Sequence, residues 1–431
     1  MNNIIDKISF KSNYLKNITF LFSGTIIGKI ILIIGTPVLS RLFTPEDFGI
    51  LGVFTALLGF LTIYATLRYT RAILLPKHLE FSAALFWLST YALLFTTVTI
   101  TIVIAFAKQS IVNVLNTPQL ETLIFLIIPA MFLAGLYDIL EYWSAKNSNY
   151  KELSISHISR NSGTLVSQVS LGFAGFGPGG LIIGLIVGKF LSATILFYQV
   201  VKNQFDLFKK SAKTKYLFYV AKRYKNFPVY SLPSNLMSKG SGSAVPILFS
   251  ALFSPHVAGL YWFTRRLISI ATDSLGKSVR QVFAQEASSL VNQKKNVYQL
   301  YLKNTLGLTA LGVLPVLIIT LFAPPLFEIV FGVEWREAGI LAQWMVVMGF
   351  VEFISHPSTE LIYILNYQKW QFYFQIVVSF FRIGSILYGS FIGDYYLAIV
   401  LLSLSVIILY LGQIIFIGIK SKNFDISDEK R

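Results

Sequence analysis

The sequence predicts an all-α integral membrane protein of about twelve transmembrane helices, arranged as two pseudo-symmetric six-helix lobes around a central cavity. Three observations lead to this prediction. Hydrophobic residues make up 55% of the 431 residues and charged residues only 13%, about half the charged share of soluble domains. Apolar segments long enough to span a bilayer follow one another along nearly the whole chain. A motif near the N-terminus also recurs 210 residues later, at the corresponding place in the second half.

Twelve apolar segments are predicted to cross the membrane, because about 20 helical residues span the hydrocarbon core. The first follows a basic stretch, residues 1–16, and its length favours a retained helix over a cleaved signal peptide. The fifth is rich in serine, and the seventh is expected to be an interrupted helix lining a cavity, because it contains Pro233, Pro246 and two glycines. The predicted segments are 20–40, 48–67, 81–106, 120–141, 153–174, 180–199, 227–253, 257–276, 301–323, 338–364, 372–392 and 395–418.

The long connection at residues 200–226 divides the chain into two sets of six helices. It is strongly basic, like juxtamembrane segments that lie against anionic lipids. We therefore expect an N-terminal lobe over residues 1–199, a basic cytoplasmic connection over 200–226, and a C-terminal lobe with a short cytoplasmic tail over 227–431.

The distribution of Lys and Arg predicts the orientation. With the N-terminus in the cytoplasm, the cytoplasmic loops and tails carry 26 of the 36 Lys and Arg residues, whereas the outer loops carry only Arg41, Lys108 and Arg336. Cytoplasmic loops collect these residues in membrane proteins, so both termini are predicted to be cytoplasmic. The same bias explains the net charge of +16 without a nucleic-acid partner.

An internal repeat relates the two halves. Shifting the chain by 210 residues aligns SRLFTPEDFGI (40–50) with SALFSPHVAGL (250–260), and Lys29 with Lys239. Because an even number of helices separates the copies, both halves start on the same side of the membrane, as in parallel repeats. The repeat predicts that helices 1, 2, 7 and 8 face one another around the cavity.

Seven cations lie inside the predicted helices, where a charge costs roughly 2.5–3.5 kcal/mol and usually faces a polar interior. The adjacent Arg265 and Arg266 break the repeat, and their planar guanidinium groups suit phosphate oxygens. Lys29 and Lys239 lie at equivalent depths, where they would either contact an anionic group in the cavity or pair with carboxylates that hold the lobes.

Three further cations lie outside the four predicted central helices. For Lys189 and Arg382, structural pairing and substrate contact are both open. Arg160 is shallower and is expected to reach the cytoplasmic surface.

Three carboxylates are candidates for ion coupling: Asp273, Glu352 and Glu360. Asp273 lies two helical turns after Arg266 on the same face, so protonation or substrate binding would break an Arg–Asp pair between them. Two other acidic residues are predicted to be solvated near the cytoplasmic interface, namely Asp138 and Glu141.

The remaining motifs indicate helix turns and packing. GFGPGG (175–180) has the GxGxxG spacing of a dinucleotide-binding loop, but it joins two predicted transmembrane helices and is interpreted as a turn. Gly180, Gly184 and Gly188 are spaced for helix packing. The chain has no cysteine and no GxSxG, HExxH or Walker motif, and its four histidines are scattered. We therefore expect no enzyme, cofactor or metal site.

Four stretches resemble the bacterial polysaccharide flippases of the Wzx type, in the superfamily that also contains multidrug and toxin extruders and the lipid II flippase. They are GTPVLSRLFTPEDFGILGVFTALLGF (35–60), TLRYTRAILLPK (66–77), HVAGLYWFTRRLI (256–268) and FAPPLFEIVFGVEWREAGILAQW (322–344). The FGxxWxxAG element (Phe331, Gly332, Trp335, Ala338, Gly339) is moderately specific to the polysaccharide branch and marks the family, not a reaction.

The resemblance implies two lobes in a V shape that work by alternating access. The implied cargo is an oligosaccharide on undecaprenyl pyrophosphate, moved to the outer leaflet of the bacterial inner membrane for surface polysaccharide such as O-antigen, other lipopolysaccharide or capsule. A polysaccharide polymerase and a chain-length regulator are further implied partners. The lipid II flippase relatives use cavity arginines in both lobes; here helix 1 carries Lys29, so only the neighbourhood of Arg265 and Arg266 is carried over.

Two alternatives are open. A small-solute or drug antiporter would use the same scaffold, but an extruder of cationic drugs should show membrane-embedded carboxylates, and here cations are in excess. A membrane glycan polymerase or ligase would be favoured by large outer loops with catalytic groups, whereas the predicted outer loops are short.

Overall fold

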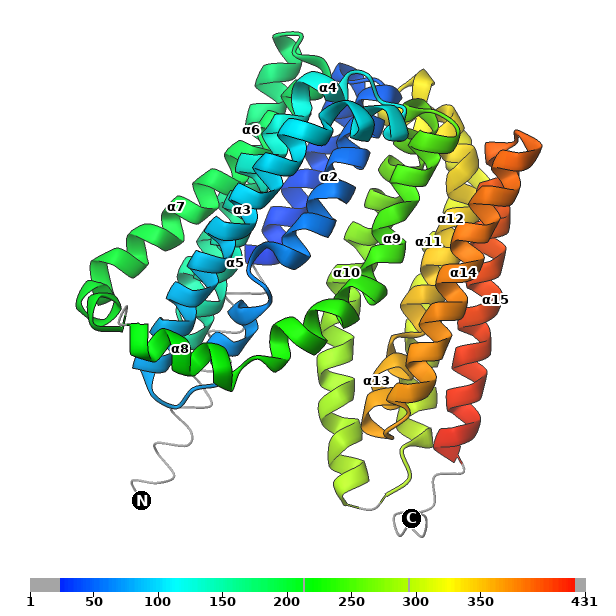
Figure 1. Ribbon diagram of the computed structural model, residues 1–431. Coiled ribbons are helices and arrows are strands. Elements are labelled where there is room, and N and C mark those ends of the chain that lie inside the picture. The colour runs from blue at the N-terminus through cyan, green and yellow to red at the C-terminus, as the bar shows by residue number, and fades with distance from the viewer. Residues whose placement is uncertain (1–23, 212–213, 294, 423–431) are drawn as a thin grey trace. The chain divides into compact units, whose positions relative to one another are not determined.

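The computed structural model describes residues 24–211, 214–293 and 295–422, and within these ranges every regular element is a helix (Figure 1). Contacts divide the chain into two compact units, Met1–Ile247 and Leu248–Arg431. We call them the N-terminal unit and the C-terminal unit.

The N-terminal unit begins with a helix described over Gly24–Leu42. There follow α2 (Pro45–Ala65), η1 (Tyr69–Leu74), α3 (Leu79–Leu115), α4 (Leu120–Leu123), η2 (Ile124–Leu126), α5 (Ile127–Lys146), α6 (Tyr150–Phe173), α7 (Gly177–Ser211), α8 (Thr214–Arg223) and the π-helical turn η3 (Phe227–Ser231). The next helix, α9 (Leu232–Leu252), contains the boundary between the two units.

The C-terminal unit contains the remaining helices. These are α10 (Pro255–Asn292), α11 (Tyr298–Phe331), η4 (Val333–Trp335), α12 (Arg336–Ile354), α13 (His356–Ile364), α14 (Gln368–Ile392) and α15 (Tyr395–Lys422).

Within the described ranges, each of the twelve predicted segments lies mainly on helical structure, and most ends agree within a few residues. Four helices continue well beyond the predicted ends: α3, α7, α10 and α11. Within the described ranges, nine helices are long and apolar enough to cross a membrane. Of the predicted spans, α6, α9 and α10 are not among these nine, because serines, glycines or charges interrupt their apolar character. The prediction of an all-helical multi-pass membrane protein is confirmed.

The predicted interruption of the seventh span is wrong, because α9 continues through Pro246. The irregular backbone lies before the helix instead, in the π-helical turn η3. Gly240 serves close packing: a Cβ added there would lie 3.2 Å from the Phe60 ring of α2. The small residues of this helix therefore allow two helices of the N-terminal unit to approach each other.

The repeated motif forms the same local structure twice, the start of a helix with proline in its first turn. Before α2, the Thr44 hydroxyl accepts a hydrogen bond from the Asp47 N–H at 3.2 Å, and the Thr44 N–H donates to the Asp47 carboxylate at 3.0 Å. Before α10, the Ser254 hydroxyl accepts from the Val257 N–H at 3.3 Å. Such N-caps satisfy N–H groups that the helix leaves unpaired, so the repeat has a structural cause in both halves.

The FGxxWxxAG element joins α11 to α12. Gly332 has a φ of 112°, which favours glycine. Trp335 is fully buried and stacks on Phe263 of α10, with ring centroids 3.9 Å apart. A Cβ on Gly339 would lie 2.7 Å from the backbone of Pro324. These contacts fix the turn against α10, in agreement with a role in the fold.

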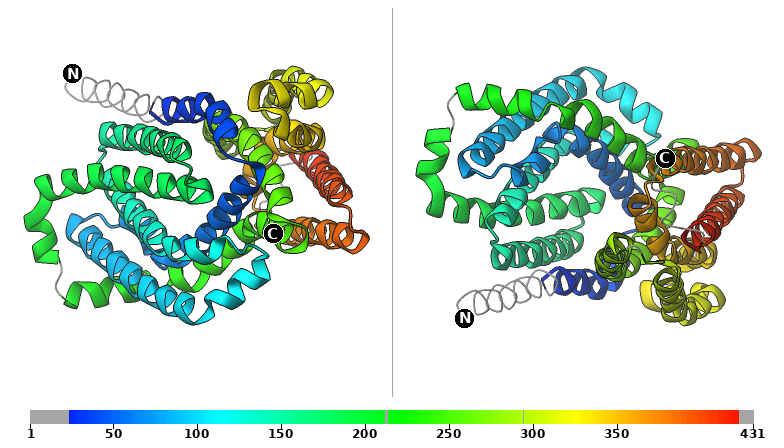
Figure 2. Two further views of the ribbon diagram at one scale, coloured as in Figure 1. Left: turned by 90° about the horizontal axis from the view of Figure 1, so that it is seen from above. Right: turned by 90° about the horizontal axis from the view of Figure 1, so that it is seen from below.

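Helices α6 and α7 form a tight hairpin and lie side by side in both views of Figure 2. The turn between them contains Gly175 and Gly177 at positive φ, so the interpretation of GFGPGG as a turn is confirmed. Gly184 and Gly188 lie directly against Gln168 and Thr164 of α6. The predicted packing role of this glycine series is confirmed.

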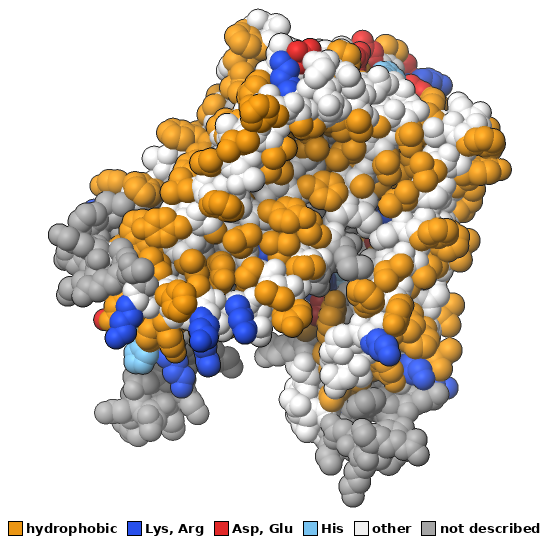
Figure 3. Space-filling view, in the orientation of Figure 1, with side chains coloured by type: hydrophobic (Ala, Val, Ile, Leu, Met, Phe, Trp, Pro, Cys, Tyr) orange, Lys and Arg blue, Asp and Glu red, His pale blue; other side chains and the backbone are white. Residues whose placement is uncertain are grey.

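Side chains of different kinds occupy different levels of the helices. On the face shown in Figure 3, hydrophobic side chains cover the helices along their length, and on the N-terminal unit several Lys and Arg side chains gather at one end. Helix α8 of the same unit also carries two basic residues, Lys222 and Arg223, in its last turn. This distribution is typical of helices that span a membrane.

Candidate functional site

Three helices of the C-terminal unit bring Arg265, Glu352 and Arg382 together. Arg265 of α10 donates from Nη2 to Oε2 of Glu352 on α12 at 2.6 Å. Arg382 of α14 donates from Nη2 to Oε1 of the same carboxylate at 2.8 Å. The side chains of Glu352 and Arg382 are 16% and 15% exposed, and that of Arg265 is 34% exposed. We call these three residues the Arg–Glu–Arg cluster.

The cluster carries a net positive charge inside bilayer-spanning helices. Two guanidinium groups share one carboxylate, so the three side chains sum to one positive charge. Arg265 lies about 15 Å along α10, and Arg382 about 20 Å along α14, at 1.5 Å per residue. Tyr261 and Tyr410 lie within electrostatic reach of all three charges. The arrangement is suited to attracting an anion to the middle of the unit.

Arg266 points to a different environment from its neighbour. Its guanidinium lies over the Trp262 ring, 5.1 Å from the centroid, one helical turn back along α10. Among the residues that the structure describes, none places a carboxylate against it. Successive helical residues point about 100° apart, which explains why only Arg265 reaches the cluster.

The other candidate residues of this half are placed as follows. Glu360 accepts a hydrogen bond from Nε of Arg280 at 2.8 Å, so it forms a second ion pair, separate from the cluster. The side chains of Asp273 and Lys239 lie outside the described part of the structure, so the predicted Arg266–Asp273 pair stays a prediction.

A polar cluster in the N-terminal unit was not found by sequence reasoning. The Arg160 guanidinium lies 5.0 Å from the Tyr137 ring centroid, and its Nη2 is 3.1 Å from Nδ1 of His157. The Tyr137 hydroxyl is 3.3 Å from that of Ser156, and Nε2 of His157 lies 3.8 Å from the Glu141 carboxylate. Arg160 and Glu141 thus both contact His157, and their predicted positions near the cytoplasmic surface stay predictions. The helical spacing of His157 and Arg160 was the available signal.

The two remaining predicted lysines lie in the same unit. Lys189 of α7 is half-buried, and it interacts electrostatically with the charged side chains of Arg160 and Asp138. Lys29 is half-buried on the first helix, next to Gly28, which lies against Asn161 of α6. The structure therefore places Lys189 near Arg160.

Arg68, outside the membrane spans, is a cation whose environment the sequence did not reveal. It adopts a left-handed backbone conformation after α2, with φ 63°. Its Nε and Nη2 atoms are buried and have no hydrogen-bond partner among the described residues. Burial lowers the pKa of the Arg68 guanidinium below its ordinary value, and the neighbouring charge of Arg71 lowers this pKa further.

The fold defines a class of protein. The structure resembles an inward-facing multidrug resistance MATE family transporter of the MOP superfamily, with a TM-score of 0.71 and 12% identity over 91% of this chain and 94% of that one. It also resembles the lipid II flippase MurJ in an inward closed conformation, with a TM-score of 0.68 and 11% identity. That match covers 95% of this chain and 91% of that one. A third similar structure is a MOP superfamily transporter from Pyrococcus furiosus, with a TM-score of 0.56 and 12% sequence identity. The match covers 94% of this chain and 96% of that one.

At these identities the likeness establishes the fold: a multi-pass membrane protein with the transporter fold of the MOP superfamily, which has twelve transmembrane helices in two lobes. Residues 38–340 match the family described as polysaccharide biosynthesis protein. The chain belongs to this family, as the resemblance predicted. No curated protein matches the sequence.

Proposed function

We propose that the protein flips an oligosaccharide linked to undecaprenyl pyrophosphate from the cytoplasmic to the outer leaflet, by alternating access and without covalent chemistry. The observation that carries this proposal is the Arg–Glu–Arg cluster, which holds excess positive charge within apolar helices. Moving a pyrophosphate through lipid removes its hydration at a large free-energy cost. Guanidinium groups replace that hydration with charge-assisted hydrogen bonds.

The cluster also supplies a mechanism for release. Glu352 accepts a hydrogen bond from a guanidinium nitrogen of each arginine. An incoming pyrophosphate competes with this carboxylate for Arg265 and Arg382, and the carboxylate reclaims them when the substrate leaves. Arg266, which contacts an aromatic ring, contributes additional positive charge. Lys29, Lys239 and Lys189 are further candidates for contact with the head group or the sugars.

The remaining organisation follows from the sequence. We assign residues 1–199 and 227–431 to the two lobes and 200–226 to a basic connection against anionic lipids of the cytoplasmic leaflet, with both termini in the cytoplasm of a bacterial cell. The product would serve a surface polysaccharide such as O-antigen or capsule, and a polymerase and chain-length regulator would receive it. Membership in the polysaccharide biosynthesis family supports this assignment.

The test is complementation of a polysaccharide-producing strain that lacks its flippase. The variants are Arg265→Ala, Arg266→Ala, Arg382→Ala and Lys239→Ala, and the control is Arg336→Ala, which removes an exposed arginine paired with Glu328. We expect these four variants to accumulate lipid-linked precursor in the cytoplasmic leaflet at normal protein levels, while the control complements.

Two results would contradict the proposal. If the cluster variants complement fully, the cationic site has no role in transport. If complete precursor reaches the outer leaflet but stays unpolymerised, the protein acts as a polymerase or ligase instead.

A further inference from the structure

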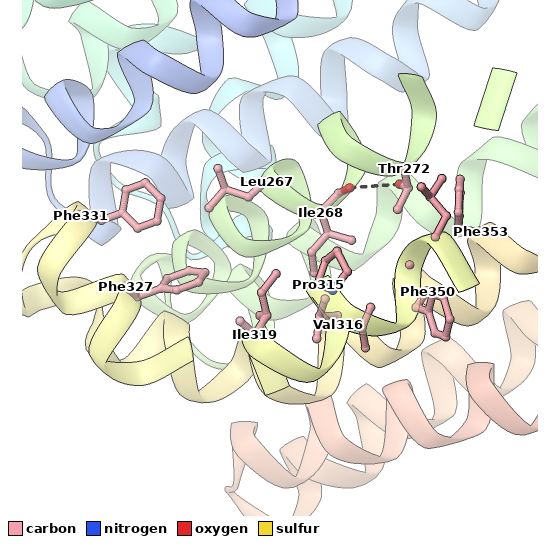
Figure 4. Close-up of a pocket in the computed structure, with 14 residues that line it drawn as sticks. Leu267, Ile268, Thr272, Pro315, Val316, Ile319, Phe327, Phe331, Phe350 and Phe353 are labelled. Carbon is pink, nitrogen blue, oxygen red and sulfur yellow. Dashed lines mark hydrogen bonds between the residues drawn. The ribbon is translucent and has the colours of Figure 1, made fainter. Parts of the chain in front are cut away.

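The C-terminal unit contains an apolar cavity of about 390 Å³ between α10, α11 and α12 (Figure 4). Its walls include Ile268 of α10, Val316 of α11, and Val346 and Phe350 of α12. The hydroxyl in its wall, that of Thr272, donates to the Ile268 carbonyl one turn back at 3.0 Å. Among the residues that line the cavity, the other side chains are apolar, so it is suited to apolar contents and not to water or a polar solute.

The cavity reaches the outer side of α11. Leu311, which lines it, is 55% exposed, and Pro315 in the same wall is also exposed. Helix α11 is the least buried of the nine apolar spans in the described ranges, with 11% of its most apolar window buried within the structure. A helix this apolar and exposed is suited to contact with lipid hydrocarbon, so a chain could enter from the bilayer without crossing a polar barrier.

The cavity adjoins the Arg–Glu–Arg cluster across α12. Val346, Phe350 and Phe353 line the cavity, and Gly349 and Glu352 lie on the neighbouring face. A Cβ on Gly349 would lie 2.5 Å from Cγ2 of Ile268 and 3.8 Å from Nη1 of Arg265. Gly349 thus lies next to both the cavity wall, at Ile268, and the guanidinium of Arg265.

We propose that this cavity binds the isoprenoid chain of the lipid-linked substrate while its phosphate faces Arg265. This inference rests on the proposed function and adds a second subsite to it. The apolar wall of the cavity lies next to the cationic Arg265, just as the apolar chain of an anionic lipid is joined to its charged head group. The subsite holds the tail beside the translocated head group, and its location among α10, α11 and α12 predicts where the tail leaves the bilayer.

The test is photolabelling of the purified full-length protein in phosphatidylcholine nanodiscs. The probe is farnesyl pyrophosphate that carries a benzophenone on its terminal isoprene unit, and labelled peptides are mapped by mass spectrometry. We expect labelling within α10, α11 and α12 of the unaltered protein. Val346→Phe fills the cavity and should reduce labelling about tenfold or more, as a change of a few methylenes does in an apolar pocket. Leu314→Phe, at a position 64% exposed on α11, is the matched control.

Mapping on the unaltered protein keeps the test decisive even if Val346→Phe folds poorly. Label confined to other helices, or undiminished label in a folded Val346→Phe protein, would overturn the proposal. Equal labelling by a phosphatidic acid with a photoreactive acyl chain would also overturn it, because the cavity would then be a site for bulk lipid. Labelling measures binding alone. Failure of flipping in the leaflet assay with retained labelling would therefore refute the proposed function and leave the lipid site.

Discussion

Replacement of Glu352 by glutamine should destabilise the C-terminal unit and disable transport together. The carboxylate is 16% exposed and lies 2.6 and 2.8 Å from two guanidinium groups. Glu352→Gln keeps the shape but leaves two partly buried arginines without a counter-charge. Removal of one partner from a buried pair costs about 3–5 kcal/mol. At about 2–4 °C per kcal/mol for a unit of this size, the melting temperature should fall by roughly 6–20 °C.

The assay is thermal unfolding of the purified protein in nanodiscs, followed by tryptophan fluorescence. The control is Glu328→Gln, which breaks a more exposed pair with Arg336. Exposed pairs contribute about 0–1 kcal/mol, so this variant should unfold close to the unaltered protein. Equal melting temperatures for the two variants would refute the reasoning, because the cluster would then be screened like a surface pair.

A triple variant separates stability from transport. Arg265→Met, Arg382→Met and Glu352→Leu replace the cluster by apolar side chains of similar size, a change that is often neutral or stabilising. We expect a melting temperature near that of the unaltered protein but no complementation. If the triple variant complemented, the cluster would be structural and the proposed function would lose its main support.

Three further predictions concern the fold, each measured by thermal unfolding. Thr44→Ala removes the cap of α2 and should cost about 1 kcal/mol, whereas Thr99→Ala, which removes an exposed hydroxyl within α3, should cost less. Gly188→Ala places a methyl against the α6 backbone and should destabilise by about 1–3 kcal/mol; Gly307→Ala meets open space and should be neutral or stabilising by up to about 1 kcal/mol. Trp335→Ala empties a fully buried site and should cost about 3–5 kcal/mol. A smaller loss for Gly188→Ala than for Gly307→Ala would contradict the packing of the hairpin.

The helical architecture could be predicted from the sequence because its signals are local. Hydrophobic length sets the spans, and the Thr-Pro and Ser-Pro steps at Thr44 and Ser254 mark helix starts. Proline in α9 was misread: a proline within a membrane helix lowers hydrogen bonding without requiring a break, since neighbouring groups compensate. The local sequence pattern therefore predicted where the helices lie, but it did not predict where their backbone is irregular.

The partners within the candidate site could not be predicted, because they depend on which helix faces meet. Arg265 and Glu352 are 87 positions apart, and Arg382 is 30 further on. All three were candidates from the sequence, the two arginines for substrate binding and Glu352 for ion coupling, but Asp273 was offered as the partner of Arg266 and no pairing with Glu352 was foreseen. Helical spacing places residues on one face of one helix; it does not say which neighbouring helix packs there.

The polar character of α6 has a consequence for biogenesis. Gln168 donates to the Leu181 carbonyl of α7 at 2.8 Å, and the glycine series of α7 lies against this face. Alone in the lipid, α6 would expose serines and Arg160 to hydrocarbon, and its amide would lose this acceptor. Because α6 leaves the ribosome first, we expect it to stay at the translocon until α7 emerges, so that the two helices enter the bilayer as a pair. A substitution that loosens the pair should then appear first as failed membrane insertion.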